Sequence, residues 1–191
     1  GHPEVGITPG VDCSTGPLGQ GLATAVGMAI GEKKLKSFNS IFNYRIYCLC
    51  GDGDMMEGIS HEAASLAGTL QLNNLIVLYD SNNVSLDSKT DKTFTENIVE
   101  RFKAYDWNVE VVKNGEDTKS ISKAIEKAKN SNKPTLIKIN TIIGCGSLLQ
   151  GTNEVHGKIL SEEDIEQLKQ KLNINNEAFF VDTEAQDLMK K

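Results

Sequence analysis

The chain has 191 residues, and 39% of them are hydrophobic, so it is long enough for one sizeable core but short for two domains. A formal net charge of −6 argues against a nucleic-acid surface, since phosphate backbones are held by clustered lysine and arginine. No apolar stretch approaches the roughly 20 residues of a membrane helix, and the first residues lack a targeting signal, so we expect a cytoplasmic protein without membrane partners.

The chain opens with the residues Gly-His-Pro-Glu at 1–4, and a glycine-rich stretch follows at 15–21. An isolated histidine near a chain end usually belongs to a frayed terminus. Glycines let the backbone approach a ligand, but the stretch lacks the Gly-Lys-Ser/Thr of a P-loop and the preceding strand of a dinucleotide fingerprint. A helix rich in small residues is predicted at 22–30, and a polar surface loop at 33–43.

An acidic turn at 51–58 follows a predicted buried strand at 46–50. An apolar run without alternation suits a parallel strand that is covered on both faces. The Gly-Asp-Gly that follows allows a sharp turn and presents the carboxylate of Asp52 at the end of the strand. The tripeptide alone is ordinary turn chemistry.

A helix at 59–70 and a second buried strand at 74–80 lead to Asn82. A right-handed crossover makes two such strands parallel, which places Asp52 and Asn82 at one edge of the sheet. A carboxylate, an amide oxygen and a free loop carbonyl are hard oxygen ligands of the kind that Mg²⁺ and Ca²⁺ prefer. These three ligands do not fill the coordination shell of either ion, so phosphate oxygens would be needed to complete it. The arrangement therefore predicts a metal-bridged diphosphate.

The remaining predicted elements provide a scaffold and bring a further strand end to the same edge. We expect a loop at 87–96, a helix at 97–105, a strand at 107–112, a helix at 117–129 capped by Asp117, and a strand at 134–141. A glycine-rich loop then leads to His156, and a capping box at 161–164 opens a helix to about Leu172. The domain is expected at 1–172, with 173–191 as a C-terminal extension or the start of an interdomain linker.

The four cysteines, at 13, 48, 50 and 145, include no Cys-x-x-Cys pair of the kind that holds zinc or performs redox chemistry. Cys48 and Cys50 point to the same face of one predicted strand about 6.6 Å apart, at the far limit for a disulfide. We therefore expect free thiols that pack in the core.

The Gly-Asp-Gly at 51–53, followed after a helix and a strand by the asparagine pair 82–83, resembles the thiamine diphosphate signature. Four further motifs occur in the order found in transketolases: Gly-His-Pro-Glu at 1–4, Thr-Gly-Pro-Leu-Gly-Gln-Gly at 15–21, Glu-Gly-Ile-Ser at 57–60 and Val-His-Gly at 155–157. The resemblance runs from Gly1 to at least Leu160. It implies an α/β diphosphate-binding domain, a mostly parallel sheet with helices on both faces, that lacks the family's preceding N-terminal segment.

The resemblance also implies a set of site residues. Those that contact the cofactor, thiamine diphosphate, would be Gly16, Leu18, Gly51, Asp52, Gly53, Glu57, Asn82 and His156. Asp52, Asn82 and the carbonyl of Val84 would hold the metal, Mg²⁺ or Ca²⁺. His2 and His156 would be catalytic and face the substrate, where His156 can donate or relay a proton.

Other polar residues have a plainer interpretation beside the one that the family suggests. From the sequence alone, His156 is a solvated loop histidine, and Glu57 and Glu62 favour the dipole at a helix start. In transketolases, glutamates at these two positions lie near the dimer interface, in a carboxylate network thought to connect two active sites. His61, between them, is expected on the helix surface.

The intact family enzyme transfers a two-carbon ketol unit between sugar phosphates in the pentose phosphate pathway. It is a homodimer in which a pyrimidine-binding domain of the partner subunit supplies the activating glutamate, so the resemblance implies that the isolated chain is inactive. Dihydroxyacetone synthase fits the same domain, and deoxyxylulose phosphate synthase is a more distant rival. A non-catalytic binding or dimerisation module is another interpretation. A magnesium-dependent nucleotidase built around Asp52 would need a phosphate-handling lysine or a second carboxylate cluster, and the sequence shows neither.

Overall fold

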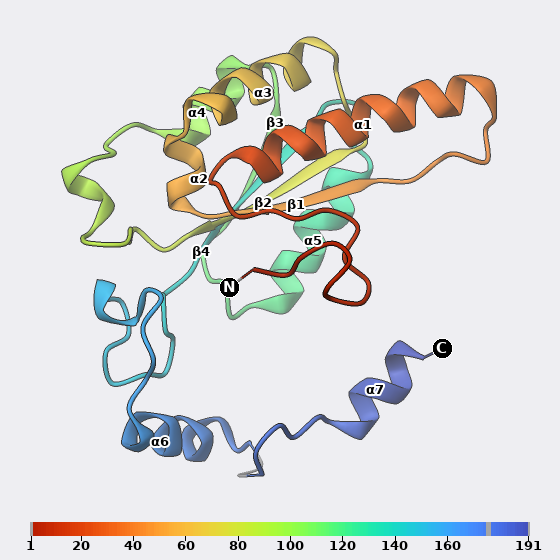
Figure 1. Cartoon of the computed structure of the whole chain (residues 1–191). Helices are drawn as coiled ribbons and strands as arrows, with labels where there is room; N and C mark the ends of the chain where they lie inside the picture. Colours follow the sequence, from red (N-terminus) through yellow and green to blue (C-terminus); the bar gives the residue numbers. More distant parts are fainter. Residues whose placement is uncertain (1, 175–176, 191) are drawn as a thin grey trace.

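We describe the protein from a computed structural model, at residues 2–174 and 177–190. Within this described part, four strands form one sheet in the order β1-β2-β4-β3, and every pairing is parallel (Figure 1). Their bounds are β1 Ile46–Cys50, β2 Leu75–Ser81, β3 Asn108–Val112 and β4 Thr135–Asn140. The predicted parallel sheet is confirmed, and β4 lies directly beside β2, so three strand ends share one edge.

Helices cover both faces of the sheet, as predicted (Figure 1). One face carries α1 (Gln20–Phe38), α2 (Asp52–Met56), α3 (Gly58–Thr69) and α4 (Ile98–Ala104), and the other carries α5 (Thr118–Lys129). The larger cluster of buried residues lies on the first face and includes Leu22, Val26, Leu75 and Phe102. The smaller cluster, beneath α5, includes Ile76, Ile137, Ala124 and Ala128.

The helix α1 is longer than predicted, and the loop expected at 33–43 is wrong for its first six residues. The segment 33–38 contains no glycine or proline that would stop a helix, and its lysines and leucine are good helix formers. Just before it, Glu32 is buried with 2% of its surface exposed, and its carboxylate accepts a hydrogen bond from Asn74 Nδ2 at 2.7 Å. This buried polar contact fixes the last turns of α1 on the sheet.

The acidic stretch after β1 is a short helix, α2, rather than a plain turn. Asp52 occupies its first turn, where the helix dipole favours a carboxylate. Met55, with no exposed surface, anchors the helix in the core. Glu57 then adopts an extended conformation, with φ −69° and ψ 137°, and separates α2 from α3.

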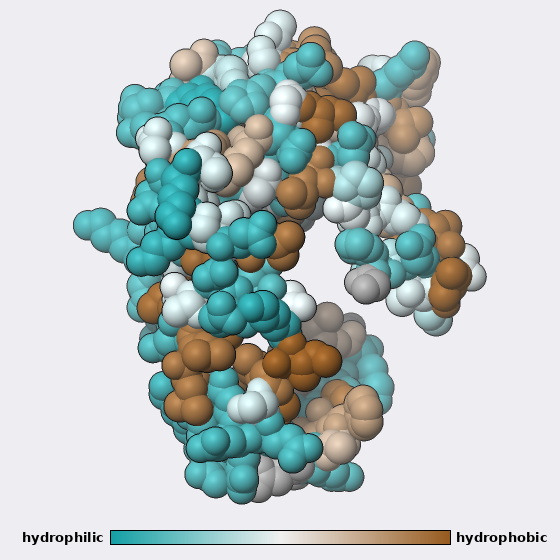
Figure 2. Space-filling model, turned by 60° about the vertical axis from the view of Figure 1, so that its left-hand side comes forward, coloured by the Kyte–Doolittle hydropathy of each residue, from teal (hydrophilic) through white to brown (hydrophobic). Residues whose placement is uncertain are grey.

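Beyond β4 the chain leaves the sheet. This part contains η2 (Asn153–Val155), α6 (Glu162–Leu172) and α7 (Thr183–Met189), and a further short turn, η1 (Thr90–Lys92), lies between β2 and α4. In Figure 2, hydrophobic patches lie among hydrophilic surface at the level of this part. Every helix of the described ranges is too short or too polar to span a lipid bilayer.

The start of α6 differs from the predicted capping box. The Ser161 side chain accepts a hydrogen bond from the Asp164 amide at 3.1 Å, as a cap should. The Asp164 carboxylate does not return to Ser161, because it accepts hydrogen bonds from Ser147 Oγ at 2.5 Å and from the Leu148 amide at 3.0 Å. Only 2% of the surface of Asp164 is exposed, so the hydrogen bonds that connect α6 to the loop after β4 are buried.

These contacts make the stability of the α6 attachment depend on pH. The Ser147 hydroxyl first, and then the Leu148 amide, hold the pKa of the Asp164 carboxyl below its ordinary value. A lowered pKa stabilises the folded state above the unfolded pKa of about 4, and this contribution is lost as the pH falls through the lower folded pKa. We expect Asp164→Asn to reduce the melting temperature at pH 7 and to differ less from wild type as the pH drops below about 4.

Thermal melts at pH 7 and at acid pH measure this effect. Glu163→Gln is a matched control, because Glu163 lies next to Asp164 on the exposed side of α6. If the melting temperature of Asp164→Asn lies equally far below that of wild type at both pH values, the lowered pKa of Asp164 does not cause the effect.

Candidate functional site

Asp52 lies two residues after the end of β1 and is almost completely buried, with 4% of its surface exposed. Its Oδ2 accepts hydrogen bonds from the backbone amides of Asn82, at 3.0 Å, and Asn83, at 2.8 Å. Its Oδ1 accepts a hydrogen bond from the hydroxyl of Tyr79. The structure therefore brings Asp52 and Asn82 together at the edge of the sheet where the crossover predicts them.

Tyr79 is a site residue that the sequence analysis treated as part of a buried strand. In the sheet register it lies beside Cys50, two residues before Asp52. Burial first, and then its hydrogen bond to Asp52, raise the pKa of Tyr79 above its ordinary value, so the phenol keeps its proton and donates it. A tyrosine near the end of a buried strand is a usable signal, because a buried phenol needs a polar partner.

The oxygen atoms at this edge fit a divalent metal. A carboxylate offers about four acceptor positions, and the three hydrogen bonds to Asp52 leave one of them free. Asn82 Oδ1 accepts the Val84 amide at 3.0 Å and keeps a second lone pair. Together with the Val84 carbonyl these are the hard oxygen donors that Mg²⁺ and Ca²⁺ take. Their role as metal ligands stays a prediction.

Asp54 connects the glycine-rich stretch at 15–21 to the acidic helix. Its Oδ1 accepts the Gly19 amide at 2.9 Å, and its Oδ2 accepts the Gly51 amide at 2.8 Å. Gly19 has φ 78°, a left-handed conformation that glycine adopts without strain. A Cβ at this position would lie 2.7 Å from Ile59 Cγ2. The backbone therefore approaches so closely here that a side chain does not fit.

Gly19→Ala should reduce the stability of the fold. The left-handed conformation costs a residue with a Cβ about 1–2 kcal/mol, and the contact with Ile59 adds to this, so we expect a loss of at least ~2 kcal/mol in the free energy of unfolding. Urea unfolding followed by circular dichroism measures it. Gly27→Ala, in open space within α1, is the matched control and should be neutral or stabilising. Equal stability of the two variants would contradict the close-approach argument.

The glycines at 16 and 53 leave room for side chains of the same site. A Cβ at Gly16 would lie 3.3 Å from His2 Cε1, and a Cβ at Gly53 would lie 3.0 Å from Leu18 Cδ1. The structure thus brings Leu18 to the acidic helix that begins with Asp52, and it brings His2 to Gly16, two residues before Leu18. His2 and Leu18 are exposed, so both side chains are accessible to a ligand.

His156 follows η2 in the long loop after β4. Asn153 Nδ2 donates to the Asp87 carbonyl at 3.1 Å, which holds this loop against the one after β2 that carries Asn82. His156 Nδ1 is buried and has no hydrogen-bond partner in the described part of the chain. A buried ring nitrogen of this kind needs an explanation, and a ligand would supply one. Within residues 2–174 and 177–190 no hydrogen bond joins His156 to Asp52 or His2.

His61 is half-buried, so the expectation that it lies on the helix surface is wrong. Arg101 Nη1 lies 2.9 Å from His61 Nε2, and His61 Nδ1 lies 3.1 Å from the Tyr105 hydroxyl. Because a guanidinium only donates, Nε2 accepts and Nδ1 carries the proton. Of the two glutamates beside it, Glu57 is half-buried and Glu62 is exposed; their place at a dimer interface stays a prediction.

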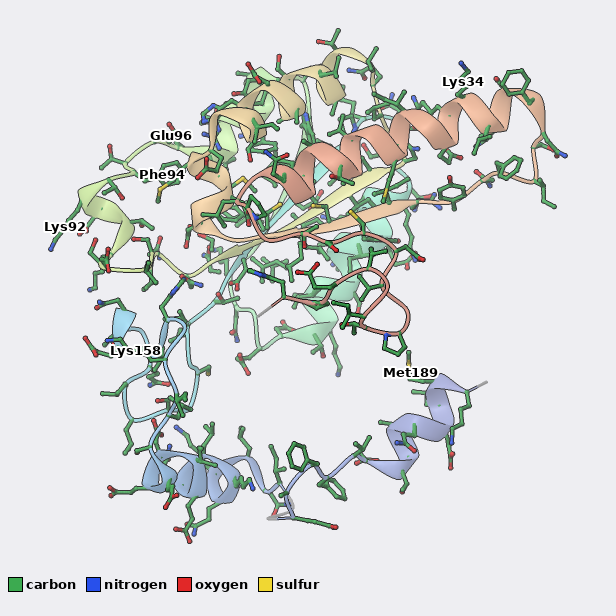
Figure 3. The ribbon with its side chains drawn as sticks, in the orientation of Figure 1. Lys34, Lys92, Phe94, Glu96, Lys158 and Met189 are labelled. Atoms are coloured by element: carbon green, nitrogen blue, oxygen red, sulfur yellow. The ribbon has the colours of Figure 1, made fainter. Side chains whose placement is uncertain are left out.

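Arg101, on α4, holds α2 in place. Its Nη2 donates to the Met55 carbonyl at 2.8 Å, and its Nη1 forms an ion pair with Glu96. Figure 3 labels Phe94 and Glu96 on the loop that leads into α4, and the guanidinium lies over the Phe94 ring. No sequence pattern indicates this role, because the three segments that Arg101 joins meet only in the folded chain.

Comparison with known proteins agrees with this geometry. The family model described as "Transketolase, thiamine diphosphate binding domain" matches residues 1–191. Transketolase from Bacillus subtilis is 55% identical over 172 residues, which are 86% of this chain and 26% of that protein. The chain therefore spans about a quarter of the length of this relative.

Solved structures give the same result. Transketolase from Leishmania mexicana is 44% identical, with a TM-score of 0.95 over 99% of this chain and 29% of that chain. Transketolase from Pichia stipitis, in complex with sedoheptulose 7-phosphate, is 42% identical, with a TM-score of 0.91 over 95% of this chain and 28% of that chain. The chain belongs to the transketolase family and matches its thiamine diphosphate binding domain.

Proposed function

We propose that this chain holds thiamine diphosphate through a divalent metal, Mg²⁺ or Ca²⁺, within an enzyme that transfers a two-carbon ketol unit from a ketose phosphate to an aldose phosphate. The observation that carries the proposal is the buried carboxylate of Asp52, which is fixed by the amides of Asn82 and Asn83 and by Tyr79. Such a carboxylate is preorganised, so little conformational freedom is lost when a metal binds.

The residues of this chain would each perform a limited task. Asp52 and the side-chain oxygen of Asn82, with the Val84 carbonyl, would hold the metal against the diphosphate. When bound, thiamine diphosphate supplies the nucleophilic carbon for the ketose carbonyl. The remaining cofactor contacts proposed are Gly16, Leu18, Gly51, Gly53, Glu57 and His156.

The two histidines would act on the substrate. His2 would contact it from the segment that packs against Gly16, where the backbone has no side chain in the way. His156 would hold or transfer a proton at a substrate hydroxyl, using a ring that has a buried nitrogen without a partner. Each histidine lies near glycine-rich backbone, so small shifts of these loops would change the distance from its ring to the substrate.

The substrates and partners follow from the family. The complex of the Pichia stipitis enzyme with sedoheptulose 7-phosphate supports sugar phosphates as substrates of the pentose phosphate pathway. We also propose a cytoplasmic homodimer, formed through the pyrimidine-binding domain, with residues 1–172 of this chain as the diphosphate-binding domain and 173–191 leading out of it.

Two measurements test the proposal. Calorimetry of the full-length gene product that contains this chain should show thiamine diphosphate binding that requires Mg²⁺ or Ca²⁺ and disappears with EDTA. The full-length gene product that contains this chain should transfer a ketol unit between a ketose phosphate and an aldose phosphate. Diphosphate binding without any transfer by the full-length protein would favour the non-catalytic module, and metal-independent binding would remove the metal from the proposal.

A further inference from the structure

A polar cavity lies at the opposite edge of the sheet from Asp52, where β1 and β2 begin. Its walls come from the last turns of α1, the segments just before β1 and β2, and the end of α5. Its volume is about 130 Å³. One water molecule takes up roughly 30 Å³ in the liquid, so this cavity has room for more than a single bridging water.

Asn74 lines this cavity and contains a buried oxygen atom without a partner. The residue is 8% exposed. Its Nδ2 donates to the Ala29 carbonyl at 2.9 Å and to Glu32 Oε2 at 2.7 Å, and because both partners accept, the orientation of the amide is fixed. Its Oδ1 is buried and accepts no hydrogen bond in the described part of the chain. A buried acceptor without a donor is costly, so Asn74 Oδ1 needs a donor from the cavity.

The walls of the cavity also carry an excess of positive charge. Four cationic side chains line it: Lys33, Lys36, Arg45 and Lys129. Glu32 contributes one carboxylate, and Glu126 forms an ion pair with Lys129. Within residues 2–174 and 177–190, the other three cations form no ion pair. Two positive charges therefore remain uncompensated, in a chain of net charge −6.

These cations are held in place and still have donors to offer. Lys33 Nζ donates to a backbone carbonyl at 2.6 Å. Lys36 Nζ donates to Asn43 Oδ1 at 2.6 Å, and Arg45 Nη2 donates to the Lys129 carbonyl at 2.7 Å. An ammonium group has three donors and a guanidinium group has five, so each of these groups can donate further hydrogen bonds. Lys33 and Lys36 are three residues apart and therefore neighbours on one side of α1.

We propose that this cavity binds a small phosphorylated polyol, with its phosphate among Lys33, Lys36 and Arg45. Phosphate oxygens accept charge-assisted hydrogen bonds from ammonium and guanidinium groups. A hydroxyl of the same molecule supplies the donor that Asn74 Oδ1 lacks. Glu32 lies beside Asn74, so its negative charge disfavours the phosphate at the inner end of the cavity and leaves that end to the neutral hydroxyl.

The test titrates the full-length gene product with glycerol 3-phosphate at low salt, followed by calorimetry. Lys33→Gln and Lys36→Gln should each weaken binding by at least about 5-fold, because each removes a charge-assisted hydrogen bond to the phosphate. Lys34→Gln is the matched control and should bind as wild type does. Figure 3 shows Lys34 on the side of α1 that faces away from the sheet, and it does not line the cavity. Circular dichroism confirms that the variants fold.

Two further ligands test the contact with Asn74. Methyl phosphate carries the same anionic group without the hydroxyls, so it should bind at least about 5-fold more weakly than glycerol 3-phosphate, because Asn74 Oδ1 stays unpaired. Glycerol, which has no phosphate, should show no measurable binding.

Four results would each overturn the proposal. If glycerol 3-phosphate does not bind, the cavity holds only water. Unchanged affinity in both Lys33→Gln and Lys36→Gln would place the glycerol 3-phosphate at another phosphate site of the protein. An equal loss of affinity in Lys34→Gln would show a general effect of surface charge, and equal affinity for methyl phosphate would remove Asn74 from the site.

Discussion

Asp52→Ala should abolish the metal-dependent binding of thiamine diphosphate. The variant loses the only carboxylate proposed as a ligand, and it also frees the amides of Asn82 and Asn83 that this carboxylate fixes at 3.0 and 2.8 Å. Changes to residues behind a metal ligand already reduce affinity 10–100-fold, so loss of the ligand itself should exceed ~100-fold. Calorimetry with Mg²⁺ and thiamine diphosphate, on the full-length gene product, measures the effect.

Two variants separate loss of charge from loss of structure. Asp52→Asn keeps an oxygen that can accept the two backbone amides, so it should fold well and still bind the metal poorly. Asp80→Asn is the matched control: Asp80 lies near the end of β2, the strand beside β1, but its carboxylate accepts a hydrogen bond from Thr141. Undiminished affinity in Asp52→Asn and Asp52→Ala would remove Asp52 from the site, and a large loss in Asp80→Asn would show that the effect is not specific.

The sheet was predictable because each strand has its own signal. Unbroken apolar runs at 46–50 and 75–79 predict parallel strands, and the intervening helix fixes their relative direction. The run at 75–79 is buried on both faces, but the expectation that 46–50 is covered on both faces is wrong, because Tyr47 and Leu49 point to a face of the edge strand β1 that nothing covers in the described part of the chain.

The limits of helices were harder to predict, as α1 shows. Its last turns depend on the buried contact of Glu32 with Asn74, which are 42 positions apart in the sequence. A local pattern contains no information about such a contact.

In the site, too, the features that follow from topology were predictable, and the contacts between distant segments were not. The proximity of Asp52 and Asn82 follows from topology, and the structure has it. The partners of these residues do not follow: Asp54 bridges two segments 35 positions apart, and Arg101 reaches Met55 from 46 positions away. The sequence shows which chemical groups meet at the sheet edge, whereas the residues that orient them are determined by tertiary packing.

His156→Ala should lower kcat/KM of the full-length enzyme by 10²–10⁴-fold, roughly 3–5 kcal/mol of transition-state stabilisation, which is the usual contribution of one positioned proton donor. The melting temperature should change little, because the side chain makes no hydrogen bond through its buried Nδ1 in the described part of the chain. Steady-state kinetics and thermal melts on the same preparation measure both quantities.

The control for this variant is Lys158→Ala, two residues along the same loop and labelled in Figure 3. Lys158 pairs with Glu154 at 2.7 Å, but both side chains are more than half exposed, and such pairs contribute about 0–1 kcal/mol. Its loss perturbs the loop surface without removing a proton donor, so kcat/KM should stay near wild type. If both variants lose activity equally, the loop matters for its shape and not for its histidine. An unaltered rate in His156→Ala would return this residue to the role of a solvated loop histidine.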